Sequence, residues 1–107
     1  MDHLPIVVEL NDRPCLVVGG GAVAERKARE LIDAGAIVTV VSPTVTTGLE
    51  RLADAGTIAL RTAAFRKVHL RGCWLIVAAT ADQELNARIA QAAESQQRFC
   101  NIVDDAE

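Results

Sequence analysis

Short β-branched segments alternate with amphipathic helical segments along this chain of 107 residues, and that alternation limits the possible folds. Strands are expected at 15–18, 36–41, 57–61, 73–79 and 99–103. Helices are expected at 23–34, 44–55 and 82–97. Strands joined through helices need right-handed crossovers, which make the strands parallel and place helices on both faces of the sheet. The sequence therefore predicts a doubly wound α/β domain with a mostly parallel five-stranded sheet, whose more polar third strand lies at an edge.

An extra strand is expected ahead of this unit. Residues 6–10 are rich in β-branched side chains and are followed by a turn signal at 11–13, so they predict an antiparallel N-terminal strand. Half of the chain is hydrophobic, 23% is charged and only 3% is aromatic, which is typical of one domain with an aliphatic core. We therefore expect a single domain over residues 1–107.

The net charge, the hydropathy and the cysteines of the chain bear on which partners to expect. The net charge of −3, with basic and acidic residues mixed, argues against a nucleic-acid backbone as partner. No apolar run approaches the roughly 20 residues that span a bilayer, and the first residues do not resemble a signal peptide, so the expected compartment is the cytoplasm without membrane contact. The three cysteines, Cys15, Cys73 and Cys100, are far apart and adjoin apolar stretches, which predicts buried, reduced thiols and no metal site.

The turn after the first expected strand consists of Gly19, Gly20 and Gly21. A glycine turn between a strand and a helix is the context of a dinucleotide-binding motif. Gly19 would allow the tight turn, Gly21 would let the backbone approach a pyrophosphate, and Ala24 would be the third small residue, against the strand. The free N–H groups of the helix N-terminus would face the phosphates. The motif predicts a Rossmann-type NAD-binding domain, with a purely structural turn as the alternative.

The second strand ends without the acidic residue that usually holds the adenine ribose. Ser42, Pro43 and Thr44 stand there instead, and either hydroxyl can bond the ribose. No arginine stands at this position to favour a 2′-phosphate, so the choice between NAD and NADP stays open at this point.

Two further positions lie just beyond predicted strand ends, where open α/β sheets bind ligands. Ala79 and Thr80 follow the fourth strand and leave room for nicotinamide and ribose; alternatively, Thr80 caps the next helix. Asp104 follows the fifth strand as a candidate acid or base, or as an inert surface carboxylate. The chain has no tyrosine, so a Tyr–Lys acid–base pair is excluded, and His3 and His69 are expected to be exposed and non-catalytic.

These segments together resemble the N-terminal domain of the siroheme synthase family. The resemblance rests on MDHLPI (1–6), GGGAVAERK (19–27), AGA (34–36), VTV (38–40), AAT (78–80) and CNIVD (100–104), and it covers essentially the whole chain. It implies an NAD-dependent dehydrogenase that oxidises precorrin-2 to sirohydrochlorin, and a ferrochelatase that takes ferrous iron as its substrate and gives siroheme. Both activities would act on one tetrapyrrole in a multifunctional enzyme.

The same resemblance assigns roles to residues. It implies that the backbone at Ala22 and Val23 and the segment 43–44 contact NAD, and that Asp104 serves both activities. Family members continue beyond the position of Glu107 into a dimerisation region, so we expect a fragment of a homodimeric protein that binds NAD but turns over poorly. After Asp104 the sequence DAE departs from the family's Ala-Pro pair, which leaves that loop undefined.

A different class of protein also fits the motif. Regulatory domains of the same fold bind NAD or another nucleotide without performing chemistry. Such sensors usually have an acidic residue at the end of the second strand, where this chain has Ser42. A sensor would also tolerate loss of Asp104.

Overall fold

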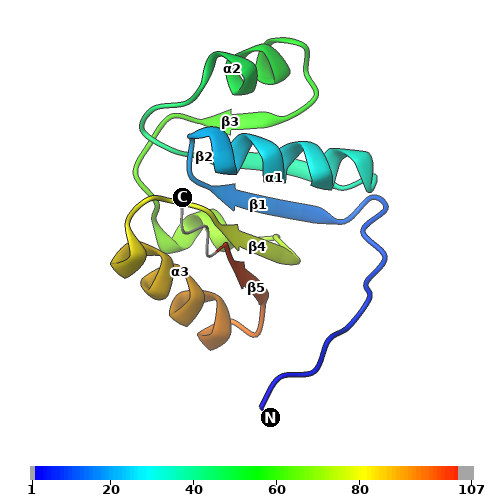
Figure 1. The fold of residues 1–107 in the computed structure, drawn as a ribbon, viewed down its shortest axis with the longest axis vertical. Helices are drawn as coiled ribbons and strands as arrows, with labels where there is room; N and C mark the ends of the chain where they lie inside the picture. The colour runs from blue at the N-terminus through cyan, green and yellow to red at the C-terminus, as the bar shows by residue number, and fades with distance from the viewer. Residues whose placement is uncertain (1, 104–107) are drawn as a thin grey trace.

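The computed structural model describes residues 2–103. The strands of this range form one five-stranded, entirely parallel sheet (Figure 1). Its strands run in the spatial order β3-β2-β1-β4-β5. They span β1 Pro14–Val18, β2 Ile37–Val41, β3 Ala59–Arg61, β4 Leu75–Ala78 and β5 Phe99–Ile102. The predicted doubly wound α/β fold is confirmed, and the polar third strand lies at an edge as expected.

Helices cover both faces of the sheet. They are α1 Ala22–Asp33, α2 Thr47–Asp54, α3 Gln83–Ser95 and the short 3-10 helix η1 Lys67–Leu70. Alternation along β1 explains the two cores, because Cys15 and Val17 pack under α1 and α2 whereas Leu16 and Val18 pack under α3 and η1. The sheet is therefore buried on both sides, which accounts for its continuous apolar strands.

The element ends differ from the sequence prediction by a few residues. The largest shift is at α2, which begins at Thr47 because the side chain of Thr46 caps it, accepting a hydrogen bond from the Leu49 amide at 3.1 Å. Gly35 has a φ of +85° and follows α1 as predicted.

The predicted N-terminal strand is wrong. Residues 2–10 form no strand and run away from the sheet (Figure 1). Ile6 and Val7 are exposed, and Leu10 is the residue of this segment that packs against the core. The physical reason is the strand order: β1 is flanked by β2 and β4, so it has no free edge on which a preceding antiparallel strand could pair. The turn predicted at 11–13 is present, with Arg13 N–H donating to the Leu10 carbonyl at 2.9 Å.

The cysteines are free, and two of them, Cys15 and Cys73, are buried as predicted, whereas Cys100 is partly exposed. Burial raises the pKa of all three thiols. Across residues 2–103 no cluster of ligating side chains could hold a metal ion. Within the same range, no helix has the length and hydropathy needed to cross a membrane.

Candidate functional site

A cavity of about 700 Å³ opens at the carboxyl ends of β1 and β4. The strand order changes direction at this point. From β1 the chain first adds β2 and β3 on one side, and it then adds β4 and β5 on the other side. Open α/β sheets bind ligands at such switch points. The lining residues include all ten sequence-predicted cofactor positions, namely Gly19, Gly20, Gly21, Ala22, Val23, Ser42, Pro43, Thr44, Ala79 and Thr80.

The three glycines of the turn have different surroundings. Gly19 has a φ of +132°, and a side chain there would collide with the Ala79 carbonyl at the end of β4. A side chain on Gly20 would collide with the Thr44 carbonyl and the Ser42 hydroxyl. A Cβ added to Gly21 would meet no atom within 4 Å. The first two glycines therefore let backbones approach each other, and the third leaves open space.

The N-terminus of α1 borders this open space. Gly21 is the N-cap residue and carries no side chain, so no side chain caps the helix. The first N–H groups of an α-helix have no carbonyl partner within it, and the aligned peptide dipoles make this end positive. Ala22 and Val23 line the cavity here. The arrangement suits a bound anion such as a pyrophosphate.

The loop after β2 forms the neighbouring part of the wall. Ser42 is buried, and its hydroxyl donates a hydrogen bond of 2.7 Å to the Thr44 carbonyl, which fixes the loop. The Thr46 amide donates to the Gly20 carbonyl at 2.9 Å and ties the loop to the glycine turn. Pro43 and Thr44 are exposed at the cavity. Of the two predicted ribose partners, Thr44 is therefore the accessible one, and Ser42 holds the loop in shape.

The wall after β4 depends on a residue that the sequence analysis missed. Asn86 in α3 is buried, with 4% of its surface exposed, and its amide donates to the Thr80 carbonyl at 3.0 Å. Its carbonyl oxygen accepts from the Thr80 amide at 3.2 Å and from the Thr80 hydroxyl at 2.6 Å. The available signal was a polar residue three positions before Ile89 on the inward face of α3.

Thr80 does not cap α3. The cap is Asp82, whose carboxylate accepts hydrogen bonds from the Glu84 and Leu85 amides at 3.0 and 3.1 Å. The Thr80 hydroxyl instead accepts from the Asp82 amide at 3.2 Å. Thr80 is thus braced from both sides at the mouth of the cavity.

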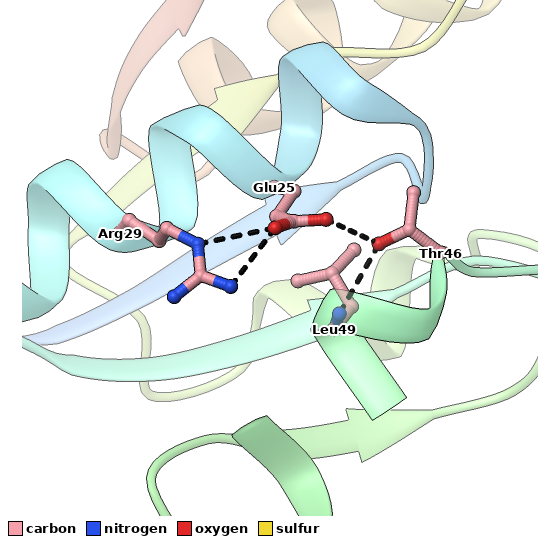
Figure 2. A network of polar contacts seen from close by, with 4 residues as sticks. All are labelled: Glu25, Arg29, Thr46 and Leu49. Carbon is pink, nitrogen blue, oxygen red and sulfur yellow. Dashed lines mark hydrogen bonds and ion pairs between the residues drawn. The ribbon is translucent and has the colours of Figure 1, made fainter. Parts of the chain in front are cut away.

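A charged network lies between α1 and the start of α2, and one of its members, Thr46, lines the cavity (Figure 2). The Glu25 carboxylate accepts a hydrogen bond of 2.6 Å from the Thr46 hydroxyl and is paired with Arg29 at 2.9 Å. The hydrogen bond from Thr46 and the guanidinium of Arg29 lower the pKa of Glu25. This network joins the helix that follows the glycine turn to the loop that carries Thr44.

The described cavity wall contains no ionisable side chain. Its residues are glycines, apolar residues, hydroxyl residues and the amides Gln83 and Asn86. Val103, the last residue that the structure describes, is part of the wall. Asp104, the predicted acid or base, lies outside the described residues. His69 is partly buried in η1, where its Nδ1 accepts from the Arg66 amide at 2.9 Å, and it is not among the cavity residues.

The sequence profile of a family described as "Putative NAD(P)-binding" matches residues 6–107. The chain belongs to this NAD(P)-binding family. The matched range includes the glycine turn, the loop after β2 and the end of β4. These are the segments that line the cavity, so the family match covers the candidate site.

This NAD(P)-binding chain is also similar to named proteins. Siroheme synthase of Escherichia coli O1:K1 is 53% identical over 104 residues, which are 97% of this chain and 23% of that protein. Siroheme synthase 1 of Aeromonas salmonicida strain A449 is 53% identical over 98% of this chain and 22% of its own length. The resemblance predicted from the sequence is confirmed, and the chain spans less than a quarter of these relatives.

A solved structure supports the same likeness. The protein described as SirC, precorrin-2 dehydrogenase, matches with a TM-score of 0.82 at 27% identity. The match covers 98% of this NAD(P)-binding chain and 51% of that chain. The Rossmann-type arrangement predicted from the glycine turn is therefore shared with a protein described as a precorrin-2 dehydrogenase.

Proposed function

We propose that this chain is the NAD-binding region of a siroheme synthase that oxidises precorrin-2 to sirohydrochlorin. The observation that carries the proposal is the cavity at the β1 and β4 ends, where the open space at Gly21 meets the uncapped N-terminus of α1. The similarity to siroheme synthases and to a precorrin-2 dehydrogenase supports the class of substrate. Because the relatives are about four times longer, the full activity belongs to a longer protein.

The residues of the cavity fit a dinucleotide. A volume of about 700 Å³ lies within the roughly 300–1,000 Å³ of ordinary ligand pockets. We assign the pyrophosphate to the backbone of residues 19–23 and the adenine ribose to Pro43 and Thr44. Ala79 and Thr80 would border the nicotinamide. All three segments line the cavity, and the assignments follow the usual places of these segments in a dinucleotide-binding fold.

NAD is the preferred form in this proposal. A 2′-phosphate is usually held by arginine or lysine, which supply charge-assisted hydrogen bonds. The described wall offers neither, and the accessible group of the β2–α2 loop is the neutral hydroxyl of Thr44. A ribose hydroxyl would therefore be bound better than a phosphate.

The oxidation also requires a proton acceptor. The chemistry that NAD would supply in this cavity is hydride acceptance, so the second hydrogen of the macrocycle must leave as a proton. None of the described lining residues has a carboxylate, imidazole or amine that could take it. We assign this role to Asp104, which directly follows the lining residue Val103 in the sequence. A carboxylate at that position would hold the proton until solvent removes it.

Iron insertion is the second part of the proposal. Ferrous iron is the substrate of this step, and two pyrrole N–H protons must leave as it enters the ring. Asp104 would accept these protons one after the other and release each to solvent, so one residue would serve both reactions. The tetrapyrrole pocket and the homodimer belong to the longer protein, and the cytoplasm is the proposed compartment.

The first test is a calorimetric titration of the natural protein with NAD and, separately, with NADP. We expect saturable binding of NAD that is at least about tenfold tighter than that of NADP, because the wall lacks a basic side chain. Binding of neither dinucleotide would contradict the proposal. NADP binding as tight as that of NAD would contradict the assignment of the ribose to Thr44.

A second test separates catalysis from binding. Asp104→Asn in the full-length protein should lower kcat for precorrin-2 oxidation about 10²-fold or more, slow iron insertion, and leave NAD affinity unchanged. Asp33→Asn, at an exposed position at the end of α1, is the matched control. If the protein binds NAD but neither oxidises precorrin-2 nor changes on loss of Asp104, it is a nucleotide-sensing module instead.

A further inference from the structure

Glu25 is an acidic residue in the first turn of α1, the helix whose N-terminus borders the cavity. It is not among the lining residues; its carboxylate points toward the start of α2 (Figure 2). There it accepts a hydrogen bond of 2.6 Å from the Thr46 hydroxyl. Arg29 donates to its other oxygen from Nε at 3.1 Å and from its terminal nitrogen at 2.9 Å. The side chain thus links α1 to α2 and does not face the cavity.

Gly48 makes room for this carboxylate. A Cβ built on Gly48 would collide with the carboxylate of Glu25. Glycine is an unfavourable residue inside a helix, yet Gly48 is the second residue of α2. The carboxylate therefore lies against the first turn of α2, where the helix dipole favours a negative charge.

Thr46 transmits this contact to the cavity. Its hydroxyl accepts from the Leu49 amide while donating to Glu25, and its amide donates to the Gly20 carbonyl at 2.9 Å. Only one residue separates it from Thr44, whose carbonyl is held by Ser42. A shift of Thr46 would therefore move the part of the loop assigned to the ribose relative to the glycine turn.

We propose that Glu25 is a positioning residue of the dinucleotide site, which holds the β2–α2 loop in its binding conformation through Thr46. The inference rests on the proposed function, because it assumes that the dinucleotide binds in this cavity. A loop that is held in place before binding loses less conformational entropy when the ligand arrives, so the affinity is higher. Arg29 offsets the negative charge of this carboxylate.

The test compares NAD affinity in Glu25→Ala, Glu25→Gln and a control. We expect Glu25→Ala to weaken NAD binding about tenfold, because Thr46 loses its partner. Glu25→Gln keeps a carbonyl oxygen that accepts from Thr46, so its affinity should lie within about threefold of the natural protein. The control is Glu30→Ala, on the same helix, which removes only an exposed ion pair with Lys27 at 3.5 Å.

Gly48 supplies a second, independent variant. Gly48→Ala should weaken NAD binding about as much as Glu25→Ala. The new Cβ would displace the Glu25 carboxylate and break its hydrogen bond with the Thr46 hydroxyl. In the Glu25→Ala background the same change should cause no further loss of affinity. It should instead raise the urea midpoint, since alanine favours the helix. The change in urea midpoint tests only the contact between residue 48 and the Glu25 carboxylate, and the NAD affinities test the positioning role.

The outcomes separate the two proposals. If the natural protein binds NAD and Glu25→Ala binds it equally well, the role of Glu25 is wrong and the cofactor site stands. Equal weakening by Glu25→Ala and Glu25→Gln would also overturn it, because the retained acceptor would then be irrelevant. If the natural protein binds neither dinucleotide, the proposed function fails and the positioning role fails with it. We expect Glu25→Ala and Gly48→Ala to weaken NAD binding, whereas Glu25→Gln and the control Glu30→Ala should bind NAD nearly as well as the natural protein.

Discussion

The two sides of the cavity are built in different ways. The glycine side, residues 19–23 with 42–46, brings backbone directly against backbone, since side chains on Gly19 or Gly20 would collide with neighbouring carbonyls. The amide side, residues 79–81 with Asn86, is shaped by one buried side chain that bonds the amide, carbonyl and hydroxyl of Thr80. One side depends on the absence of side chains and the other on the presence of one.

This difference affects how each side tolerates change. At Gly19 and Gly20 an added side-chain atom must displace backbone, which packed interiors resist. On the amide side the cost arises when a partner is lost, because buried backbone groups are left without hydrogen bonds. The first side is therefore sensitive to larger residues and the second to less polar ones.

The largest expected effect is that of Gly19→Ala. Gly19 has a φ of +132°, which disfavours alanine, and the new Cβ would collide with the Ala79 carbonyl. Strain and overpacking each cost roughly 1–3 kcal/mol, so we expect a loss of about 4 kcal/mol in the free energy of unfolding. Urea denaturation followed by circular dichroism measures this loss. A destabilisation below about 1 kcal/mol would show that the turn can relax.

Gly21→Ala is the matched control on the same turn. Its φ of −88° suits alanine, and its Cβ would meet no atom within 4 Å, so the fold should lose less than about 1 kcal/mol. The same Cβ would occupy the space assigned to the pyrophosphate, and we expect NAD affinity to fall at least about tenfold. Stability and binding should thus separate at Gly21 and fall together at Gly19.

The amide side is tested by Asn86→Leu. Leucine has a similar size but leaves the Thr80 amide and carbonyl without their partner, which should cost about 2–3 kcal/mol in the free energy of unfolding. Gln91→Ala, at an exposed position of α3, should change stability by less than about 0.5 kcal/mol. If Asn86→Leu were as stable as the natural chain, water would have to satisfy Thr80, and the amide would not brace the wall.

The same contrast explains what the sequence could and could not predict. Glycines between a strand and a helix form a local pattern with a known backbone requirement, so the turn and the fold were predictable. Asn86 was missed because its polarity suggested an exposed position, whereas its partner lies in the turn before the helix. The strand expected at 6–10 was wrong because β propensity does not report that the following strand, β1, is already paired on both sides by β2 and β4. The role of Asp104 stays a prediction.

The N-cap residues of α2 and α3, Thr46 and Asp82, allow the two sides of the cavity to be compared through smaller effects. Asp82→Ala removes the acceptor for two amides at the start of α3 and should cost about 1 kcal/mol. Thr46→Ala removes the cap of α2 and should cost about 1–2 kcal/mol. Thr46→Ala should also weaken NAD binding, because it frees the loop from Glu25, whereas Asp82→Ala should not. Equal effects of both caps on affinity would contradict the distinction between the two sides.

The smallest expected effect is the alkaline pH dependence of stability, and it comes from the thiols of both halves of the sheet. Burial raises the pKa of Cys15 in β1, of Cys73 and of Cys100 in β5, so the folded chain holds these protons at a pH where the unfolded chain has released them. Stability should therefore be constant up to the usual thiol pKa of about 8.5 and fall as the pH rises above it.

The chain contains no tyrosine, so no phenol titrates in the same window. Urea midpoints measured from pH 7 to 9.5 should decline for the natural chain and decline less for Cys100→Ala, which removes one of the raised pKa values. Cys100 is partly exposed, whereas Cys15 is fully buried, so the variant tests the thiol that can be replaced with the least repacking. A midpoint that rises with pH, or identical slopes for the two proteins, would mean that the folded chain does not retain these protons.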